Sequence, residues 1–355
     1  MDAYHLRQIP PIRLGLLRSG GLMLPRGRLL GLVFLTLPLF CFACSSGSNS
    51  PGTGPHDQYF LVTVNTQIPY WQTAGAGFAK AASELHVQGA VAGPASYDPK
   101  AEQQEFRRVA QTKPAGILVS PADPDLMKPD IDAAIASGIP VITVDADSSA
   151  SKRLSFIGTD NYEAGRMGAE IVSRSLQGSG NVMIFTMPEQ TNLNERYRGY
   201  MEILAAYPHI TVLPVVDIKG DPQIAFAETQ KVIASGQAKV DAFVCLDALG
   251  GKGVAKALNA GHISGKTVIA MDADPETLDW IRKGYIQGTI AQRPFTMGFV
   301  GLKMLEDLHR HAPRSLNIIW AKEPFSPVPS FVNTGVIWID KQNVDTFARA
   351  LATQE

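Results

Sequence analysis

The stretch GILVSPADPDLMKPDIDAAIASGIPVITVD, residues 116–145, shows the alternation that determines the fold. Two short apolar runs, Gly116–Val119 and Val141–Val144, enclose a helical window at Pro129–Ser137 that stops at Gly138. Runs that are apolar throughout are typical of strands in parallel sheets, because helices cover such sheets on both faces. The stretch therefore predicts a strand, a helix and a second strand.

The same alternation continues in both directions from this stretch. Further apolar runs predict strands at residues 59–64, 182–186, 212–216, 242–246 and 268–271. Helical windows lie between the runs, at residues 71–85, 164–176, 224–235 and 253–260. Regular alternation predicts an α/β protein. A chain of 355 residues exceeds the length at which one core usually stops growing. We therefore expect two doubly wound parallel-sheet lobes, with a TIM barrel as the alternative.

Composition narrows the possible classes of protein. Hydrophobic residues make up 45% of the chain and charged residues 18%, which excludes a disordered, collagenous or disulfide-stapled chain. A mean hydropathy of +0.01 excludes a transporter with many membrane spans. The formal net charge of −1 gives no electrostatic reason to expect nucleic acid as a partner. Two soluble domains are expected.

The first 44 residues differ from the rest of the chain. They contain five arginines and one acidic residue, a net charge of +4, which leaves −5 for the remainder. The mostly apolar run Leu29–Ala43 follows the arginines, an order that is typical of an export signal. A permanent membrane-spanning helix, the alternative, needs about 20 apolar residues. Met23 would be a more typical start for such a signal than Met1.

The end of this run is more specific. Phe42-Ala43-Cys44-Ser45 resembles a bacterial lipobox, in which a cysteine becomes lipidated and N-terminal, although Cys41 stands where Leu is usual. We expect residues 1–44 to be a signal peptide with a lipobox and Cys44 to be lipidated, with ordinary signal cleavage nearby as the alternative. Residues 45–56 contain no apolar residue and are expected to form a flexible tether. The predicted location is the periplasm or cell envelope, with anchoring to a membrane through Cys44.

Motifs for metal, cofactor or nucleophile chemistry are missing from the sequence. If Cys41 is removed and Cys44 is acylated, Cys245 is alone, so neither an intrachain disulfide nor a zinc site of the usual spacing is expected. Cys245 ends an apolar run and is expected to be a buried packing thiol. Gly250–Gly253 lacks the P-loop pattern, and no dinucleotide-binding or G-x-S-x-G motif occurs. No cofactor, metal or catalytic residue is therefore predicted.

Polar and aromatic side chains follow the predicted strands, at the edge where open α/β sheets bind ligands. They are Tyr70, Trp71, Asp145, Asp147, the run Glu189–Arg198, Asp247, Asp272, Asp274, Gln292 and Arg293. Carboxylates and arginine bind hydroxyl groups through several hydrogen bonds, and aromatic rings pack against the apolar faces of a sugar. Each residue alone has a simpler explanation, as a helix cap, a core aromatic or a surface ion-pair partner. Their recurrence at successive strand ends favours a ligand site.

Ordered motifs along the chain carry a resemblance to a known family. They are Gln67–Trp71, Gly116–Pro121, Gly138–Asp145, Phe156–Asn161, Arg196–Tyr200, Met271–Asp272, Gly288–Gln292 and Asn333–Val336. In this order and spacing the chain resembles the type I periplasmic sugar-binding proteins, the ribose/galactose-type substrate-binding components of ABC transporters. The resemblance covers Asp57 to about Asp345.

The resemblance implies an architecture and a mode of action. Two lobes would be joined by three hinge crossings, near Thr159, Arg293 and the Pro-rich stretch Glu323–Ser330. The N-terminal lobe would contain residues 57–159 and 293–322, and the C-terminal lobe residues 160–292 and 323–355. A small sugar, a monosaccharide, would be captured as the lobes close and delivered to an ABC permease in the membrane. The protein would act as a monomer without a cofactor.

Carried over by position, the family's ligand contacts fall on Tyr70 and Trp71 for ring stacking and on Asp145, Arg198, Asp272 and Gln292. Ile68, Ala146 and Leu246 depart from the ribose pattern, so ribose itself is in doubt. Replacement hydrogen bonds could come from Asp147, Gln72, Asn192 and Asn194. The predicted ligand-binding set is Tyr70, Trp71, Asp145, Asp147, Asn194, Arg198, Asp247, Asp272 and Gln292.

Three other functions share parts of this pattern. A lactose-repressor-type regulator has the same two-lobed body, but an export signal stands here in place of its DNA-binding helix-turn-helix, so no nucleic acid is expected. A sugar sensor that feeds a chemoreceptor or a sensor kinase would have an identical binding body. A carbohydrate-active enzyme would use paired acids such as Asp145 and Asp147, although nothing marks either as a proton donor.

Overall fold

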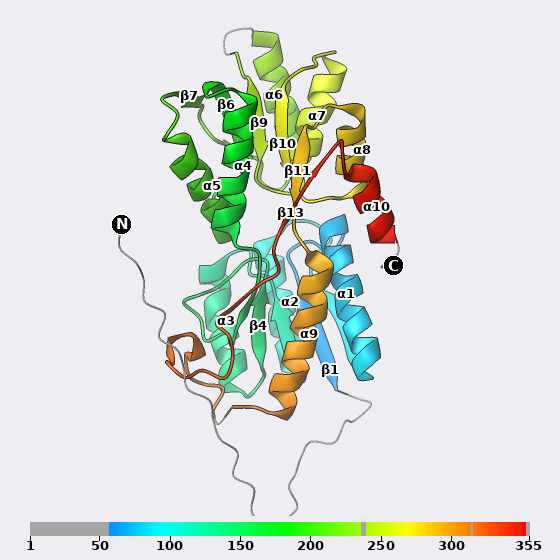
Figure 1. Cartoon of the computed structure of the whole chain (residues 1–355). Coiled ribbons are helices and arrows are strands. Elements are labelled where there is room, and N and C mark those ends of the chain that lie inside the picture. Colours follow the sequence, from blue (N-terminus) through cyan, green and yellow to red (C-terminus); the bar gives the residue numbers. More distant parts are fainter. Residues whose placement is uncertain (1–56, 236–238, 314, 353–355) are drawn as a thin grey trace, which may run out of the picture. The chain divides into compact units, whose positions relative to one another are not determined.

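The computed structural model describes residues 57–235, 239–313 and 315–352 (Figure 1). The predicted signal peptide, Cys44 and the predicted tether at residues 45–56 lie outside the described residues. The folded body consists of two α/β lobes, each built on its own sheet. Within the described ranges, no helix has the length and apolar character that crossing a bilayer requires.

The first lobe has a sheet of six strands in the described part of the chain, and every neighbouring pair is parallel. In spatial order the strands are β12 (Phe331–Asn333), β5 (Phe156–Gly158), β4 (Val141–Val144), β3 (Gly116–Val119), β1 (Gln58–Val62) and β2 (Gln88–Ala92). The helices of this lobe are α1 (Pro69–Leu85), α2 (Pro99–Gln111), α3 (Pro124–Ala136) and α9 (Pro294–Arg310). Helix α1 packs against α9, and α2 packs against α3.

The second lobe has a sheet of seven strands, counted over the same described ranges. In spatial order they are β13 (Ile337–Asp340), β11 (Gly288–Ala291), β10 (Thr267–Met271), β9 (Ala242–Cys245), β6 (Ser179–Thr186) and β7 (His209–Val212), with β8 (Val216–Asp217) also paired to β6. The pairs are parallel except for β11 with β13. The helices are α4 (Asn161–Ser175), α5 (Thr191–Leu204), α6 (Pro222–Ser235), α7 (Gly250–Ala260), α8 (Pro275–Lys283) and α10 (Val344–Ala352).

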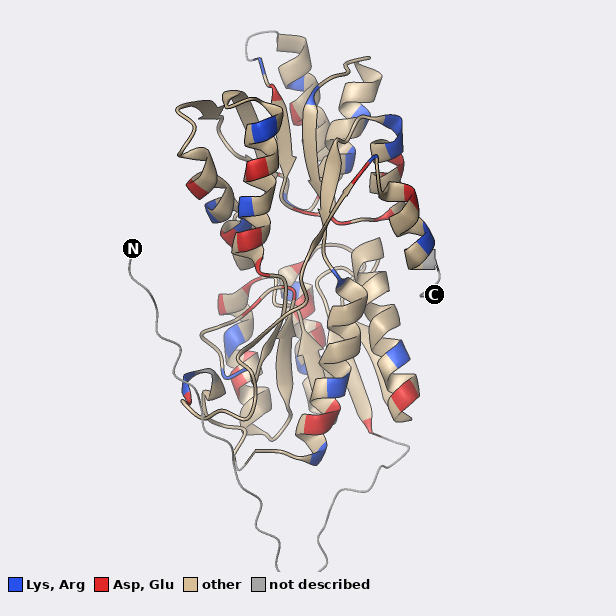
Figure 2. Ribbon diagram, in the orientation of Figure 1, with Lys and Arg blue, Asp and Glu red and all other residues tan. Residues whose placement is uncertain are grey.

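Apolar runs explain the central strands. Strands β3, β4, β9 and β11 contain no charged residue, and every residue in them is buried. Lys, Arg, Asp and Glu lie mostly on the helices, while the ribbons of the central strands carry neither colour (Figure 2). This distribution is the one expected when helices cover both faces of a parallel sheet.

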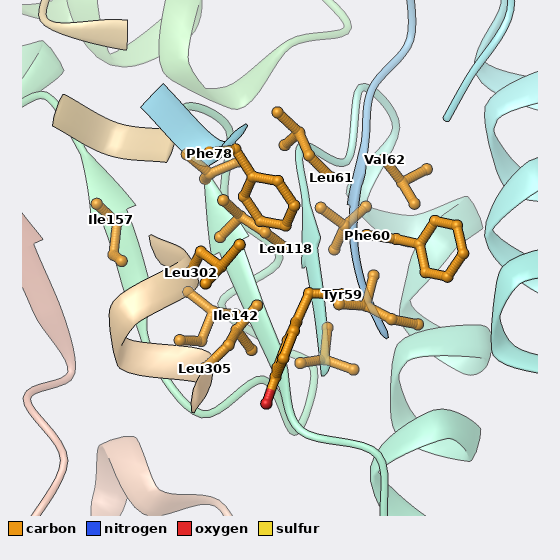
Figure 3. Packing of buried hydrophobic residues seen from close by; sticks show 14 of the residues in the cluster. Tyr59, Phe60, Leu61, Val62, Phe78, Leu118, Ile142, Ile157, Leu302 and Leu305 are labelled. Atoms are coloured by element: carbon orange, nitrogen blue, oxygen red, sulfur yellow. The ribbon is translucent and has the colours of Figure 1, made fainter. Parts of the chain in front are cut away.

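Each lobe has its own hydrophobic core. In the first lobe Tyr59, Leu61 and Leu118 from the sheet meet Phe78 of α1 and Leu302 of α9 (Figure 3). The predicted class, an α/β fold of two doubly wound, largely parallel lobes, is confirmed. Two separate open sheets exclude the TIM barrel, since a barrel would close a single sheet on itself.

The chain passes between the lobes three times within the described residues, and one crossing differs from the prediction. The first follows β5 and the second follows β11. The third joins β12 to β13 at residues 334–336, so the prediction of a crossing in Glu323–Ser330 is wrong. Because β12 pairs with β5, residues 331–333 belong to the first sheet and not to the C-terminal lobe as predicted. The prolines of residues 323–330 suit a surface loop as well as a linker, and β12 is too short to be recognised as a strand.

Helices α1 and α9 touch through their backbones, because glycine stands at the contact on both sides. A Cβ atom on Gly298 would lie 2.0 Å from the carbonyl oxygen of Ala74, and one on Gly77 would lie 2.0 Å from that of Phe295. This close approach places the first turn of α1 beside α9, where the Tyr70 hydroxyl lies 3.5 Å from the Met297 sulfur.

We predict that Gly298→Ala destabilises the protein by about 1–3 kcal/mol, because the added methyl group meets rigid backbone rather than a movable side chain. The loss should exceed the gain of about 1 kcal/mol in helix propensity. The thermal denaturation midpoint measures it. Gly261→Ala is the matched control, since its Cβ would lie 3.4 Å from the Ala257 carbonyl oxygen, an ordinary contact. An equal loss in both variants would contradict the proposed role of the backbone contact.

Candidate functional site

A cavity of about 80 Å³ lies where the carboxyl ends of the two sheets face each other. Its walls come from the segments that follow β1, β2, β3 and β4 in the first lobe and β6, β8, β9 and β10 in the second, together with the crossing after β11. One water molecule needs about 10–15 Å³ by this measure, so the cavity has room for roughly five to eight waters. That space suits a small metabolite rather than a polymer.

Two carboxylates, Asp145 and Asp272, occupy equivalent places in the two lobes. Each directly follows a strand, β4 or β10, and donates its backbone N–H to a carbonyl of the neighbouring strand, Ile157 or Ile290, at 3.0 Å. Both have a left-handed backbone, with φ of +63° and +65°. Asp and Asn tolerate this conformation better than most residues, and it gathers at functional sites.

Tyr70 and Trp71 enter the cavity from the first turn of α1. Pro69 starts the helix, because its fixed φ suits the first helical position. The two rings pack edge to face with centroids 5.0 Å apart and an interplanar angle of 86°. The Tyr70 hydroxyl donates to Asp145 Oδ1 at 2.7 Å. Both aromatic residues are buried, so Trp71 forms an apolar wall and Tyr70 orients a carboxylate.

Arg196, on α5, brings a buried positive charge to the cavity and is only 3% exposed. Its Nε donates to Asn161 Oδ1 at 2.9 Å, and its Nη1 donates to the Leu246 carbonyl at 2.6 Å. Its Nη2 is buried without a hydrogen-bond partner among the described residues. An unmade hydrogen bond of a buried group costs about 1–3 kcal/mol, and more for a charged group. This nitrogen is therefore a favourable position for a ligand oxygen.

Two amide side chains connect the walls of the cavity. Gln292, in the second crossing, accepts from Thr159 Oγ1 of the first crossing at 2.8 Å and donates to Asp272 Oδ1 at 3.1 Å. Asn192, on α5 of the second lobe, donates to Asp145 Oδ2 of the first lobe at 3.2 Å. The hydrogen bond between Asn192 and Asp145 joins the two lobes directly, which is the arrangement expected of a closed conformation.

Asp247 lines the cavity, but its carboxylate also binds backbone N–H groups of the loop that follows it. Its two carboxylate oxygens accept from the backbone N–H groups of Leu249 and Gly250, both at 3.0 Å, where α7 begins. A carboxylate at this place stabilises a helix N-terminus. Asp247 therefore has less capacity to bind a ligand than Asp145 or Asp272.

Burial sets the protonation of these carboxyl groups. It raises the pKa of Asp145 and of Asp247, and it raises the pKa of Asp272 to about 7. The nearby Asp145 carboxylate adds to the rise at Asp272, and the Arg196 guanidinium opposes it at all three groups. The ionised carboxylates are thus costly in the unliganded protein, and groups that donate hydrogen bonds to them would be bound favourably.

Two predicted contacts on α5 lie outside the cavity. The Arg198 side chain is 64% exposed, pairs with Glu195 at 2.6 Å and lies over the Tyr162 ring at 4.6 Å from its centroid. Asn194 is an exposed residue whose Nδ2 donates to the Pro188 carbonyl at 2.7 Å. Neither residue belongs to the lining of the cavity. The structure thus places Arg198 and Asn194 away from the cavity, and Arg196 and Asn192 of the same helix line it instead.

The helical period explains this correction. Successive residues of an α-helix turn by about 100°, so residues four apart share a face and residues two apart point away from each other. Asn192 and Arg196 share the buried face of α5 with Leu193 and Tyr200. The motif Arg196–Tyr200 contains two arginines, and resemblance alone did not show which one faces the cavity. The apolar periodicity of this helix could have identified Arg196.

Asp147 also lies outside the cavity. Its carboxylate accepts from Arg153 Nε at 2.8 Å and Nη2 at 2.6 Å, and from Thr143 Oγ1 at 2.6 Å. It therefore stabilises the loop between β4 and β5 and does not line the cavity in which it was predicted to bind a ligand. Strand β2 was not recognised in the sequence, so Tyr97, which follows β2 and lines the cavity, was missed.

The remaining predicted residues surround one cavity. They are Tyr70, Trp71, Asp145, Asp247, Asp272 and Gln292. Cys245 is buried in the second core, and burial raises the pKa of its thiol. Over the described ranges, no three His, Cys, Asp or Glu side chains form a group that could hold a metal ion.

Comparisons with known proteins agree with this architecture. Residues 59–312 match the family described as periplasmic binding protein domain. The ribose import binding protein RbsB of Bacillus subtilis (strain 168) is 22% identical over 286 residues, which cover 78% of this chain and 92% of that protein.

Two solved structures are similar as well. The arabinose-binding protein AraP from Geobacillus stearothermophilus is 32% identical with a TM-score of 0.70, covering 82% of this chain and 99% of that chain. An ABC transporter solute-binding protein from Burkholderia graminis C4D1M, solved in complex with D-arabinose, is 28% identical with a TM-score of 0.73. It covers 81% of this chain and 96% of its own. The chain belongs to the periplasmic binding protein family, whose members bind substrates outside the cytoplasm.

The raised pKa of Asp272 predicts how stability depends on pH. The folded protein keeps this proton up to a pKa of about 7, while the unfolded chain releases it near 3.8. The folded state thus binds more protons between these values, and the free energy of unfolding falls as pH rises through that window. Asp272→Asn removes this titration and keeps a side chain that tolerates the left-handed backbone.

Thermal or urea denaturation of the unliganded protein from pH 4 to 8 measures the effect. The stability of the Asp272→Asn variant relative to the unsubstituted protein should increase from about pH 4 to about pH 7 and then level off. A difference that stays constant over this range would contradict a raised pKa at Asp272.

Proposed function

We propose that this protein is the sugar-binding component of an ABC importer and that it captures a monosaccharide in the cavity between its lobes. The observation that carries the proposal is the buried Nη2 of Arg196, which has no partner among the described residues and belongs to a side chain that lines the cavity together with Asp145 and Asp272. A neutral molecule rich in hydroxyl groups satisfies both kinds of group. Its hydroxyls donate to the carboxylates, and its oxygens accept from the guanidinium.

The proposed ligand contacts come from both lobes. Asp145 and Asp272 accept hydrogen bonds from ring hydroxyls, while Arg196 and Gln292 donate to sugar oxygens. Trp71 packs against an apolar face of the ring. Asn192 and Tyr70 hold the Asp145 carboxylate in place, and Asp247 adds a further acceptor. The similar proteins named for ribose and arabinose, both pentoses, support a monosaccharide.

Closure of the lobes couples binding to delivery. The ligand would bridge groups of the first lobe, such as Asp145, to groups of the second, such as Arg196, so it would bind the closed form better than the open form. Only this difference in affinity shifts the population toward closure. The hydrogen bond between Thr159 and Gln292 connects two of the crossings that must flex. A permease would then recognise the closed pair of lobes.

Two other functions use the same cavity. A sensor role would need a receptor instead of a permease, and neighbouring permease and ATPase genes distinguish the two. A glycosidase would need a carboxylic acid that donates a proton to a leaving group and a second carboxylate beside it. We propose binding without turnover, since the family consists of substrate-binding proteins and the cavity carboxylates accept hydrogen bonds from Tyr70, Asn192 and Gln292.

We further propose that the protein is a monomer in the periplasm or cell envelope and is anchored to a membrane through a lipid on Cys44. The lipobox-like sequence Phe42–Ser45 and the apolar run before it support this location. The polar tether at residues 45–56 would leave the body free to meet the permease.

We predict that the mature protein is stabilised by one sugar class. At 100 times its dissociation constant, a ligand adds roughly 2.7 kcal/mol of stability, which a thermal-shift screen of sugars, polyols and small metabolites detects. The same sugar should be recovered unchanged after incubation. A shift caused by another metabolite class, with none from sugars, would overturn the monosaccharide proposal.

Arg196→Met should weaken sugar binding roughly 10- to 150-fold, because a hydrogen bond to a charged group contributes about 1.5–3 kcal/mol. Arg198→Met, two residues away on the exposed face of the same helix, is the control and should bind sugar normally. Calorimetric titration gives both affinities, and the unliganded denaturation midpoints report any loss of fold. Equal affinities in the two variants would remove Arg196 from the site.

Cys44→Ala should abolish lipid attachment. Intact protein mass after extraction from membranes measures the modification, and Cys41→Ala is the control that should keep it. A lipid that persists on the Cys44→Ala chain would contradict the proposed anchor.

A further inference from the structure

One large apolar side chain stands out on the surface. Phe325 is 97% exposed, whereas the next most exposed large apolar residue among those described, Val91, is 42% exposed. The flanking prolines Pro324 and Pro327 are exposed as well. Packing within the described part of the chain gives no reason for an aromatic ring at this position.

The Phe325 ring projects from a loop that is held against the first lobe. Residues 315–330 form most of the connection from α9 to β12, and Trp320 and Val328 pack against the first core. Ser155 Oγ donates to the Pro329 carbonyl at 2.7 Å, and Arg153 Nη1 donates to the Ser330 carbonyl at 2.9 Å. Packing of Trp320 fixes the chain before Phe325, and the two hydrogen bonds fix it after Phe325, so the exposure of the ring is a property of the loop's shape.

This loop lies at the end of the first lobe opposite the sugar cavity. It leaves the C-terminus of α9 and leads into the N-terminus of β12, while the cavity lies at the carboxyl ends of the strands. The chain enters β1 at the same end, since Asp57 Oδ1 lies 3.9 Å from His309 Nε2 in the last turn of α9. Figure 1 shows the orange-brown loop at this end of the lobe.

The length of the preceding chain brings this end close to the proposed anchor. The tether predicted from the sequence, residues 45–56, has 12 residues between Cys44 and Asp57. A flexible tether of that length has a root-mean-square span of about 17–21 Å, and it cannot exceed about 43 Å. A lipid on Cys44 would therefore hold the loop within reach of the bilayer surface.

The composition of the loop suits an apolar interface. Only Lys322 and Glu323 are charged among residues 315–330, and their charges cancel. Most of this loop carries neither charge colour in Figure 2. Phe is one of the side chains that membrane-surface segments bury at the headgroup boundary, where the ring leaves water without crossing the bilayer.

We propose that the loop end around Phe325 docks on the bilayer to which Cys44 is anchored. The inference rests on the lipid anchor of the proposed function and goes beyond it. Docking would attach the first lobe to the membrane at two places, through the lipid on Cys44 and through the loop end around Phe325. The second lobe would stay free to open and close.

Photocrosslinking of the full chain in its native membrane tests this proposal. Phe325→benzoylphenylalanine places a reactive ketone where the ring lies, and Val91→benzoylphenylalanine is the matched control on the same lobe. After irradiation, trypsin releases residues 323–341 as a peptide that does not contain Cys44. The expected result is a mass increase of one phospholipid on this peptide, and none on the peptide that contains residue 91.

Each other outcome overturns the docking. A protein crosslinked through residue 325 would identify a protein partner in place of lipid. If the chain is found in the membrane fraction but carries no lipid adduct at residue 325, docking is refuted and the anchor stands. If the chain is absent from the membrane fraction, both the docking and the lipid anchor are refuted. The sugar-induced thermal shift of the Phe325 variant should equal that of the unsubstituted chain, which separates this test from the test of sugar binding.

Discussion

Parallel pairing is the constraint on which the rest of the body depends. Between two parallel strands the chain must return from the carboxyl end of one strand to the amino end of the next, and helices supply this connection here. The strands of each lobe therefore end together, apart from the antiparallel β13. Segments far apart in sequence, from Val64 to Gln292, consequently meet around one cavity. The crossings after β5 and β11 bring the two sets of strand ends face to face.

The cavity brings buried charge and backbone strain together in one place. Asp145 and Asp272 have left-handed backbones and raised pKa values, and Arg196 keeps one nitrogen without a partner among the described residues. These features cost stability in the unliganded protein. Their close placement is best explained by a polar ligand that satisfies them together. The two cores, which are built from apolar side chains, supply the stability that offsets the cost.

The sequence predicts the site well where a residue directly follows a buried strand. Asp145 and Asp272 come immediately after apolar runs, so the strand itself determines where their side chains lie. Prediction failed on α5, because residues two apart on a helix point to opposite sides and motif resemblance alone does not give the phase. It failed at Asp147 because a local partner, Arg153, is brought near by the turn into β5.

The third crossing shows the same limit. Strand β12 contains three residues and takes its place only by pairing with β5, which lies far earlier in the chain. By itself, the sequence determined the alternation of the central strands with helices, the two-lobed class and most of the polar residues at the strand ends, because apolar runs and their period act locally. Tertiary structure alone decided which arginine is buried, which carboxylates lie near it and where the chain passes between the lobes for the third time. Those choices depend on contacts between segments that no local pattern records.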